Sequence, residues 1–234
     1  PSNVVRSVFE SVVEHGEIVR PFLGVRYLQI TPEIAEQNRL DVDHGVLIVR
    51  GQNRGDLAVI PGSPADKAGL VENDIILEID GITEGAAVTA LAAERAIDSE
   101  SPLLIVNSDQ YIQWDSSSAL YDFSRDGIDA GVLFFRSSHP KWSFIRRDEH
   151  GLVTEVAEKK PISDLATVGI YYWKTGSLFV ENAKKMINKN VRVNGEFYIA
   201  PVFNELIDSG GRVAAAEVDA MWGLGTPEDL RYFH

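Results

Sequence analysis

An apolar run in the second half of the sequence ends close to a carboxylate. Residues Leu103–Val106 are all apolar, and Asp109 follows them after Asn107 and Ser108. Four consecutive apolar residues are typical of a strand that is buried on both faces of a parallel sheet. In α/β folds, the carboxyl end of such a strand is where carboxylates that bind a divalent cation stand. The alternative for Asp109 is an aspartate that caps the following helix.

The composition excludes several other kinds of chemistry. The 234 residues include no cysteine, which removes disulfides, thiolate zinc sites and a cysteine nucleophile. No Gly-x-Ser-Gly-Gly nucleophile loop occurs, and His15 and His44 are lone histidines, more typical of surface or packing positions than of a catalytic base. The net charge of −13 argues against nucleic acid as a partner, because binding phosphates needs a basic face. No apolar run approaches the ~18–20 residues of a membrane helix, so we expect no membrane partner.

The hydrophobic patterns change near residues 81–85. Before this point, periodicity predicts an amphipathic helix over residues 2–14 and strands at 46–50, 57–60 and 74–80. Thr31 and Ser63 each precede a proline, which predicts that two helices begin there. After this point, predicted strands at 103–106, 131–136, 168–173 and 212–218 alternate with predicted helices at 86–97, 176–188 and 199–209. This alternation favours an α/β fold with a mostly parallel sheet.

Three motifs in the first part of the chain resemble the PDZ domain of HtrA/Deg serine proteases. They are RPFLGV at residues 20–25, GSPADKAGL at 62–70 and NDIILEIDG at 73–81. The resemblance implies a linker helix over residues 1–19 and an incomplete PDZ domain over residues 20–83, an α+β fold with a small barrel-like sheet. We expect the backbone N–H groups of Leu23, Gly24 and Val25 to bind the terminal carboxylate of a peptide. The alternative is that these residues form core and a turn.

Residues 84–234 resemble the sugar-phosphate nucleotidyltransferases that make nucleotide-sugars. The motifs are PLLIVNSDQ at 102–110, EVAEKKP at 155–161, ATVGIYY at 166–172, NGEFY at 194–198 and WGLGTPEDL at 222–230. The resemblance implies a GT-A-like α/β fold with a mostly parallel, mixed sheet. It also implies transfer of a nucleoside monophosphate from an NTP to a sugar 1-phosphate, with release of pyrophosphate, and Mg²⁺ as cofactor.

The same resemblance assigns roles to particular residues. It implies that Asp109 binds Mg²⁺, that Lys159 holds the phosphate of the sugar phosphate, and that Glu158 binds a sugar hydroxyl. Thr167 and Gly169 are expected at the substrate face of the next strand, where glycine allows close approach of the sugar. The alternatives are a solvated charged turn at 158–160, where Lys160 is a second lysine, and plain strand packing at 167–169.

Two departures from the family pattern limit the expected activity. The first strand and the glycine-rich loop that binds NTP phosphates are missing, since no G-x-G-x-x-R pattern occurs in the chain. Gly223 stands where related enzymes often have a second metal-binding aspartate. Catalytic residues therefore stay unassigned, and we expect a nucleotidyltransferase domain that is catalytically incomplete.

The two resemblances favour a chain joined from two incomplete parts, and Pro1 as the first residue fits a fragment. The alternative is the PDZ module of an HtrA-like protease that binds peptide C-termini, with the rest a fusion or assembly artefact. The transferase part is expected in the cytoplasm, where NTP is present, whereas HtrA proteases usually work outside it; no signal peptide is visible. At the junction, we expect residues 103–106 to pair with 131–136 or 168–173 and not with 22–80.

Overall fold

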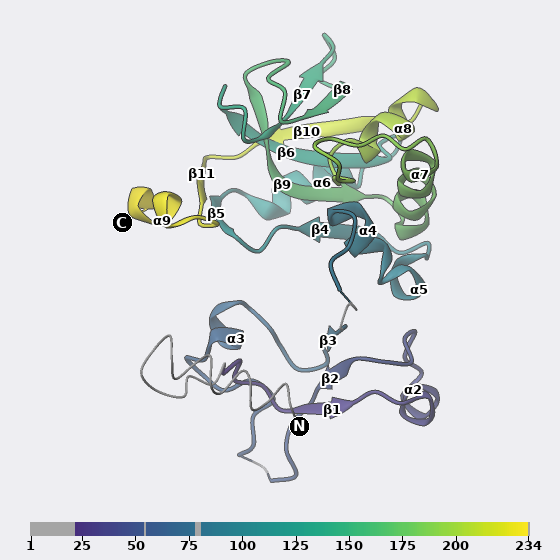
Figure 1. The fold of residues 1–234 in the computed structure, drawn as a ribbon, viewed down its shortest axis with the longest axis vertical. Coiled ribbons are helices and arrows are strands. Elements are labelled where there is room, and N and C mark those ends of the chain that lie inside the picture. The colour runs from purple at the N-terminus through teal and green to yellow at the C-terminus, as the bar shows by residue number, and fades with distance from the viewer. Residues whose placement is uncertain (1–21, 54, 78–80, 234) are drawn as a thin grey trace. The chain divides into compact units, whose positions relative to one another are not determined.

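The chain divides into two compact units, Pro1–Glu78 and Ile79–His234, called unit 1 and unit 2 below (Figure 1). The computed structural model describes residues 22–53, 55–77 and 81–233. The helix predicted over residues 2–14 and the linker over residues 1–19 lie outside the described residues. Among the helices that are described, none has the length and apolar character needed to cross a membrane.

Unit 1 is built on a short antiparallel sheet in the order β1 (Tyr27–Gln29), β2 (Val46–Ile48), β3 (Ile75–Ile76). Helix α2 (Pro32–Asn38) begins after Thr31, whose hydroxyl accepts a hydrogen bond from the Ile34 amide. Helix α3 (Pro64–Lys67) begins after Ser63, which accepts from the Asp66 amide. Both predicted helix starts are therefore confirmed.

The core of unit 1 is small. Its buried apolar cluster consists of Ile30, Ala35, Val42 and Leu47. The strand predicted at residues 57–60 is wrong, because this segment contributes one isolated bridge, between Val25 and Val59. The predicted strand at 74–80 shortens to β3, and residues 78–80 lie outside the described part.

Unit 2 contains a six-stranded sheet in the order β10-β6-β9-β7-β8, with β4 also paired to β9. The strands are β4 (Leu103–Val106), β6 (Ala130–Arg136), β7 (Ser143–Arg147), β8 (Val153–Glu158), β9 (Leu165–Trp173) and β10 (Val213–Glu217). A separate pair joins β5 (Gln110–Gln113) to β11 (Ala220–Gly223) in antiparallel register. The sheet is mixed, as expected, but the prediction that it is mostly parallel is wrong. Within the described sheet, β10–β6 is the parallel pair, and the pairs of β9 with β4, β6 and β7 and of β7 with β8 are antiparallel.

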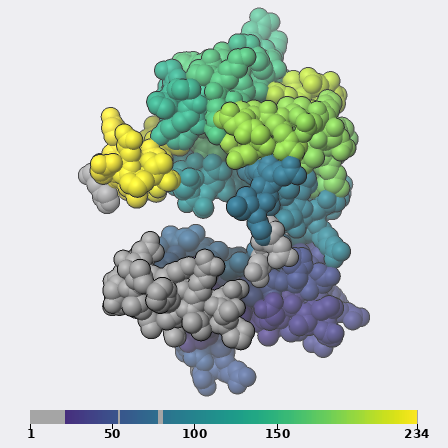
Figure 2. Space-filling view, viewed as in Figure 1, coloured from purple at the N-terminus to yellow at the C-terminus, as the bar shows by residue number. Residues whose placement is uncertain are grey.

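Helices cover both faces of this sheet. On one face lie α7 (Gly176–Asn188) and α8 (Val202–Asp208), with α4 (Ala86–Leu91) and α5 (Glu94–Ile97) packed against α7 or its core. Trp173 stacks on Phe203 here, with ring centroids 4.6 Å apart. Helix α6 (Ser116–Phe123) packs on the other face through Phe123, and α9 (Pro227–Phe233) contacts β11. In the space-filling view, α7 and α8 form one continuous surface of unit 2 (Figure 2).

Strand β4 belongs to unit 2, as the junction prediction required. Leu103 pairs with Trp173 and Val106 with Ile170, so β4 joins the sheet through β9. The prediction that β4 is covered on both faces is wrong, since Leu104 and Val106 are 41% and 52% exposed. The exposed side chains alternate with Leu103 and Ile105, which pack on the core, so one face of β4 is covered and the other is open; no described strand pairs with its second edge. An apolar sequence therefore occupies an edge position here.

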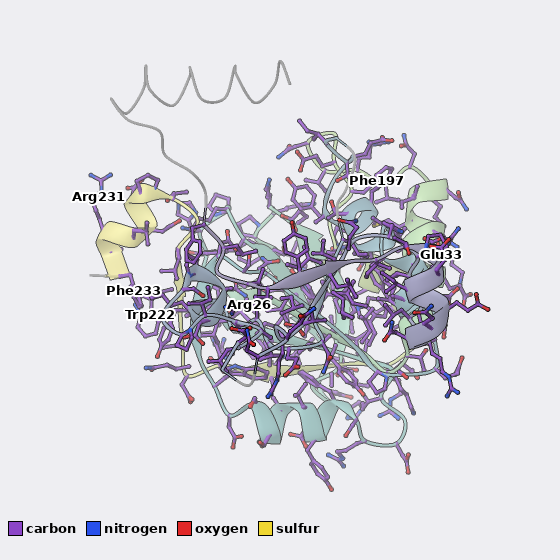
Figure 3. The ribbon with its side chains drawn as sticks, turned by 90° about the horizontal axis from the view of Figure 1, so that it is seen from below. Arg26, Glu33, Phe197, Trp222, Arg231 and Phe233 are labelled. Atoms are coloured by element: carbon purple, nitrogen blue, oxygen red, sulfur yellow. The ribbon has the colours of Figure 1, made fainter. Side chains whose placement is uncertain are left out.

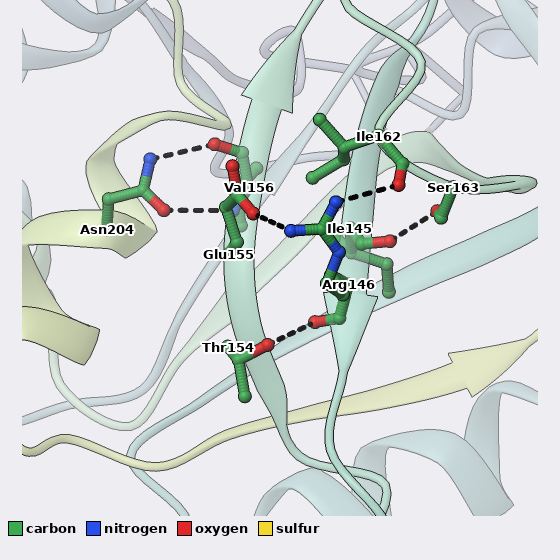
Figure 4. Close-up of polar contacts among 8 residues, drawn as sticks. All are labelled: Ile145, Arg146, Thr154, Glu155, Val156, Ile162, Ser163 and Asn204. Carbon is green, nitrogen blue, oxygen red and sulfur yellow. Dashed lines mark hydrogen bonds and ion pairs between the residues drawn. The ribbon is translucent and has the colours of Figure 1, made fainter.

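The β7–β8 hairpin, whose polar contacts are drawn in Figure 4, positions the charged segment at residues 158–160. Ser143 pairs with Glu158 at its open end. Asn204 of α8 fixes β8, because its side chain accepts from the Val156 amide at 2.9 Å and donates to the Val156 carbonyl at 2.8 Å. Arg146 on β7 pairs with Glu155 on β8. The position of Glu158 is thus set by sheet register and by a helix anchor.

Candidate functional site

A pocket of about 270 Å³ opens in unit 2 beside the start of β7, the end of β8 and the middle of β9, and we call it the Glu158 pocket. Four of the five unit 2 residues that were predicted to have a role line it together. These are Glu158, Lys159, Thr167 and Gly169. The other walls come from Asn107, Gln110, Lys141, Trp142, Ser143, Tyr171 and Tyr198. Segments far apart in the sequence therefore meet in one cavity.

Glu158 lies partly buried in the pocket wall. The Ser143 hydroxyl donates a hydrogen bond to its carboxylate. Burial raises the pKa of Glu158, and the Ser143 hydrogen bond and the charge of Lys159 oppose this rise. Burial also raises the pKa of Tyr171, another lining residue, to about 12, so that phenol keeps its proton at neutral pH. The pocket thus offers a carboxylate that accepts hydrogen bonds and a neutral hydroxyl.

Lys159 has an unusual backbone conformation at the end of β8. Its φ is 54°, in the left-handed region that non-glycine residues rarely adopt. Its amide donates to the Trp142 carbonyl at 3.0 Å, and its ammonium donates to the Tyr198 hydroxyl while lying 4.5 Å from the Tyr198 ring centre. The hydrogen bond to Tyr198 raises the pKa of Lys159, so the side chain is positively charged at neutral pH. Lys160 is exposed and is not part of the pocket wall.

Gly169 lines the pocket and packs closely against the Asn107 side chain. Its φ is +73°, and a Cβ added there would lie 2.4 Å from the side-chain amide nitrogen of Asn107. The Asn107 backbone amide also donates to the Gly169 carbonyl at 2.9 Å. Thr167 is buried two residues earlier, with its hydroxyl 3.4 Å from that of Tyr171. Both the conformation and the contact require glycine at position 169.

Gln110 is a pocket residue that sequence reasoning missed. Its side-chain nitrogen is buried and has no hydrogen-bond partner among the described residues. A buried donor without a partner costs about 1–3 kcal/mol, so such a group in a cavity wall points to a ligand acceptor. The signal that could have found it is the alternation of β5, which places Gln110 on the same face as Ile112 of the core.

Asp109 stands apart from these residues. It is exposed and does not line the Glu158 pocket. Its carbonyl accepts from the Leu224 amide at 2.7 Å, and a Cβ on Gly225 would lie 2.5 Å from its carboxylate oxygen. No group of three or more His, Asp or Glu side chains that could hold a metal exists among the described residues. The donor set that is described does not by itself fit a Mg²⁺ site.

In the predicted peptide loop of unit 1, two backbone carbonyls accept hydrogen bonds from other segments, whereas three amides have no partner among the described residues. The Leu23 carbonyl accepts from the Ala65 amide at 2.9 Å, and the Gly24 carbonyl accepts from the Ile60 amide at 2.8 Å. The amides of Leu23, Gly24 and Val25 donate to no residue that the structure describes. Gly24 has a φ of +86°, and a Cβ there would lie 2.2 Å from that of Ser63.

Comparison with known proteins relates the first part of the chain to PDZ domains and the chain more widely to periplasmic serine endoproteases. A family model described as a PDZ domain matches residues 55–83. A DegP-like periplasmic serine endoprotease from Marinomonas sp. is 42% identical over 81 residues, 35% of this chain and 16% of that protein. The periplasmic serine endoprotease DegP of Salmonella typhimurium is 24% identical over 167 residues, 70% of this chain and 33% of that protein. The first part of the chain is PDZ-like.

Solved structures match the fold of the second part. A nucleoside-diphosphate-sugar pyrophosphorylase from Vibrio cholerae superposes with a TM-score of 0.59 at 24% identity, covering 72% of each chain. A structure described as a glucose-1-phosphate thymidylyltransferase from Bacillus anthracis, in complex with a sucrose, gives a TM-score of 0.55 at 18% identity, covering 71% of this chain and 65% of that one. Over the aligned part, the chain shares the fold of these two structures.

The chain is short beside its curated relatives. It spans between about a sixth and a third of the length of the first proteases that it matches. Both resemblances read from the sequence are therefore present, one in the PDZ match and one in the nucleotidyltransferase fold.

Proposed function

We propose that unit 2 binds a sugar 1-phosphate in the Glu158 pocket and represents the sugar-phosphate half of a nucleotidyltransferase. The observation that carries the proposal is that Lys159, a cation, and Glu158, a hydrogen-bond acceptor, line one pocket together with Gly169. A phosphate needs a charge-assisted donor, and sugar hydroxyls need acceptors. The left-handed backbone of Lys159 supports a ligand role, because strain of this kind is typical of binding sites.

The proposal does not include binding of NTP or transfer of the nucleotide by this chain alone. The chain has no glycine-rich loop, and its described carboxylates do not make a Mg²⁺ site. When bound in an intact enzyme of this fold, Mg²⁺ neutralises phosphate charge during transfer. We therefore expect Asp109 to contribute one ligand at most, and NTP to bind only where another segment supplies the missing loop. We also propose that unit 2 binds the sugar phosphate in the cytoplasm and that the chain was joined from two incomplete parts.

The test is calorimetric titration of the full chain with glucose 1-phosphate, galactose 1-phosphate, glucose and inorganic phosphate. We expect a sugar phosphate to bind more tightly than either fragment. Lys159→Gln removes a charged hydrogen bond worth about 1.5–3 kcal/mol and lowers affinity roughly 10–100-fold. Lys160→Gln is the matched control, since it removes the same charge from an exposed neighbour. Equal affinities of the two variants would contradict the proposal.

A second candidate function rests on three amides of unit 1 that have no hydrogen-bond partner among the described residues. We propose that Leu23, Gly24 and Val25 bind the carboxylate of a peptide C-terminus, in the manner of PDZ domains. Fluorescence anisotropy with a peptide library tests this, with each peptide compared to its C-terminal amide. Loss of binding on amidation supports the proposal. A library in which free and amidated peptides bind alike contradicts it.

A further inference from the structure

A second cavity of about 500 Å³ adjoins the Glu158 pocket, and we call it the aromatic cavity. The two cavities share Lys141 and Trp142 as wall residues. The aromatic cavity is also lined by Phe135, Trp222 and Tyr232. Ligand pockets usually have ~300–1,000 Å³, so the Glu158 pocket alone is small and the two together fall within the range. The shared wall makes one extended site the natural interpretation.

Specific contacts hold the walls of the aromatic cavity in place. Lys141 donates to the Asp229 carboxylate at 2.7 Å, and the Thr226 hydroxyl donates to the same carboxylate at 2.8 Å. These contacts lower the pKa of Asp229, with the hydrogen bond from Lys141 as the main cause, so it is ionised at neutral pH. They also tie α9 to the loop before β7. Phe135 packs edge-on against Trp142, with centroids 5.4 Å apart.

The far wall is formed by β11 and α9. Trp222 lies 5.6 Å from the Tyr111 ring and 6.1 Å from the Phe233 ring, and Figure 3 shows Trp222 and Phe233 side by side. Tyr232 is 89% exposed on α9, which projects from the margin of unit 2 (Figure 2). The cavity thus combines aromatic faces with a rim that carries two carboxylates, Glu228 and Asp229.

We propose that the aromatic cavity is a subsite for a second sugar ring, so that the ligand of unit 2 is a disaccharide 1-phosphate. A pyranose ring has an apolar C–H face, which packs on aromatic rings, and an edge of hydroxyls, which donate to carboxylates. A nucleotide fits less well, because its phosphates would meet Glu228 and Asp229. The inference rests on the proposed function, since the phosphate-bearing ring occupies the Glu158 pocket.

Calorimetry with the full chain compares glucose 1-phosphate with maltose, isomaltose and laminaribiose 1-phosphates. We expect at least one disaccharide phosphate to bind tenfold or more tightly than glucose 1-phosphate. In Trp222→Ala, the ratio of the two affinities falls to about one. Tyr232→Ala, at a position exposed enough to spare the fold, reduces the same ratio. A change in tryptophan fluorescence accompanies the disaccharide and is lost in Trp222→Phe.

The outcomes separate this inference from the proposal beneath it. If glucose 1-phosphate binds and none of the disaccharides binds better, the second subsite is refuted while the proposed function stands. If neither class binds, the proposed function fails, and the inference fails with it. A ratio that stays at tenfold in both Trp222→Ala and Tyr232→Ala places the second ring elsewhere and overturns the assignment of the cavity.

Discussion

Replacing Gln110 by leucine should stabilise unit 2 and weaken its ligand binding. The buried nitrogen of Gln110 has no partner among the described residues, and an unsatisfied buried donor costs about 1–3 kcal/mol. Leucine has a similar volume and removes that cost. For a unit of this size, 1 kcal/mol shifts the melting temperature by ~2–4 °C, so we expect a rise of about 2–10 °C. The lost donor should lower affinity for glucose 1-phosphate roughly 2–10-fold.

Differential scanning calorimetry and titration of the same preparations measure both effects. Gln113→Leu is the matched control, because Gln113 lies on the same strand but is exposed. Its free energy of unfolding should stay within about 0.5 kcal/mol of that of the wild type. A lower melting temperature for Gln110→Leu would mean that the amide already has a partner. Unchanged ligand affinity would remove Gln110 from the binding site.

Three further outcomes follow from the described contacts. Glu158→Gln should be more stable than the wild type at neutral pH. The pKa of Glu158 is raised in the folded protein, so the wild type loses stability as the pH rises and this carboxyl ionises. Chemical denaturation from pH 4 to 8 should show the unfolding free energies of the two proteins converging below the ordinary carboxyl pKa of 4.5. Gly169→Ala should cost more than Gly151→Ala in thermal melts, since both have positive φ but only the first meets a neighbouring side chain. Leu104→Lys should leave the melting temperature within about 2 °C, whereas Ile105→Lys, which points into the core, should lower it by ~5 °C or more.

Strand β4 shows what a hydrophobic pattern can and cannot predict. Its pairing with β9 was predictable, because an apolar strand in unit 2 has to join the apolar sheet. The solvent exposure of β4 was not predictable. A hydrophobic pattern shows that a strand is suited to burial, but it does not show whether another element covers the strand. Asn107 donates to Gly169 and Ser101 accepts from Gly176, so alternate residues face β9. The backbone groups of Leu104 and Val106 then face the open edge.

Strand direction was the part of the fold that the sequence could not supply. Alternation of helices and strands predicted parallel neighbours, but β6 and β9 are separated by a hairpin and not by a crossover helix. Antiparallel strands can be joined by short connections. The hydrophobic pattern did not predict how long these connections are, and so it did not predict the strand direction. The helix over residues 176–188, by contrast, was predicted with its limits, because its N-cap and its periodicity are both local signals.

The pocket residues that lie within sequence motifs were predictable. Those that reach the pocket only through the pairing of neighbouring strands were not. Glu158 and Lys159 were read from one charged segment, and the structure brings them together with Gly169. Ser143 reaches Glu158 only through the pairing of β7 with β8, which no local pattern predicts. Trp142 enters through the same hairpin. Asp109 was assigned from its place after a strand; it is not among the residues that line the pocket, and its role as a metal ligand stays a prediction.

Chemical-shift mapping of the full chain with glucose 1-phosphate tests the central claim most directly. The account predicts that amide shifts change along the Glu158 pocket, first at Glu158, Lys159 and Gly169, and saturate with one affinity. It also predicts that Lys159→Gln abolishes these changes at the same ligand concentration, whereas Lys160→Gln retains them. Shift changes confined to residues 22–77, or none at all at millimolar ligand, would contradict a sugar-phosphate site in unit 2.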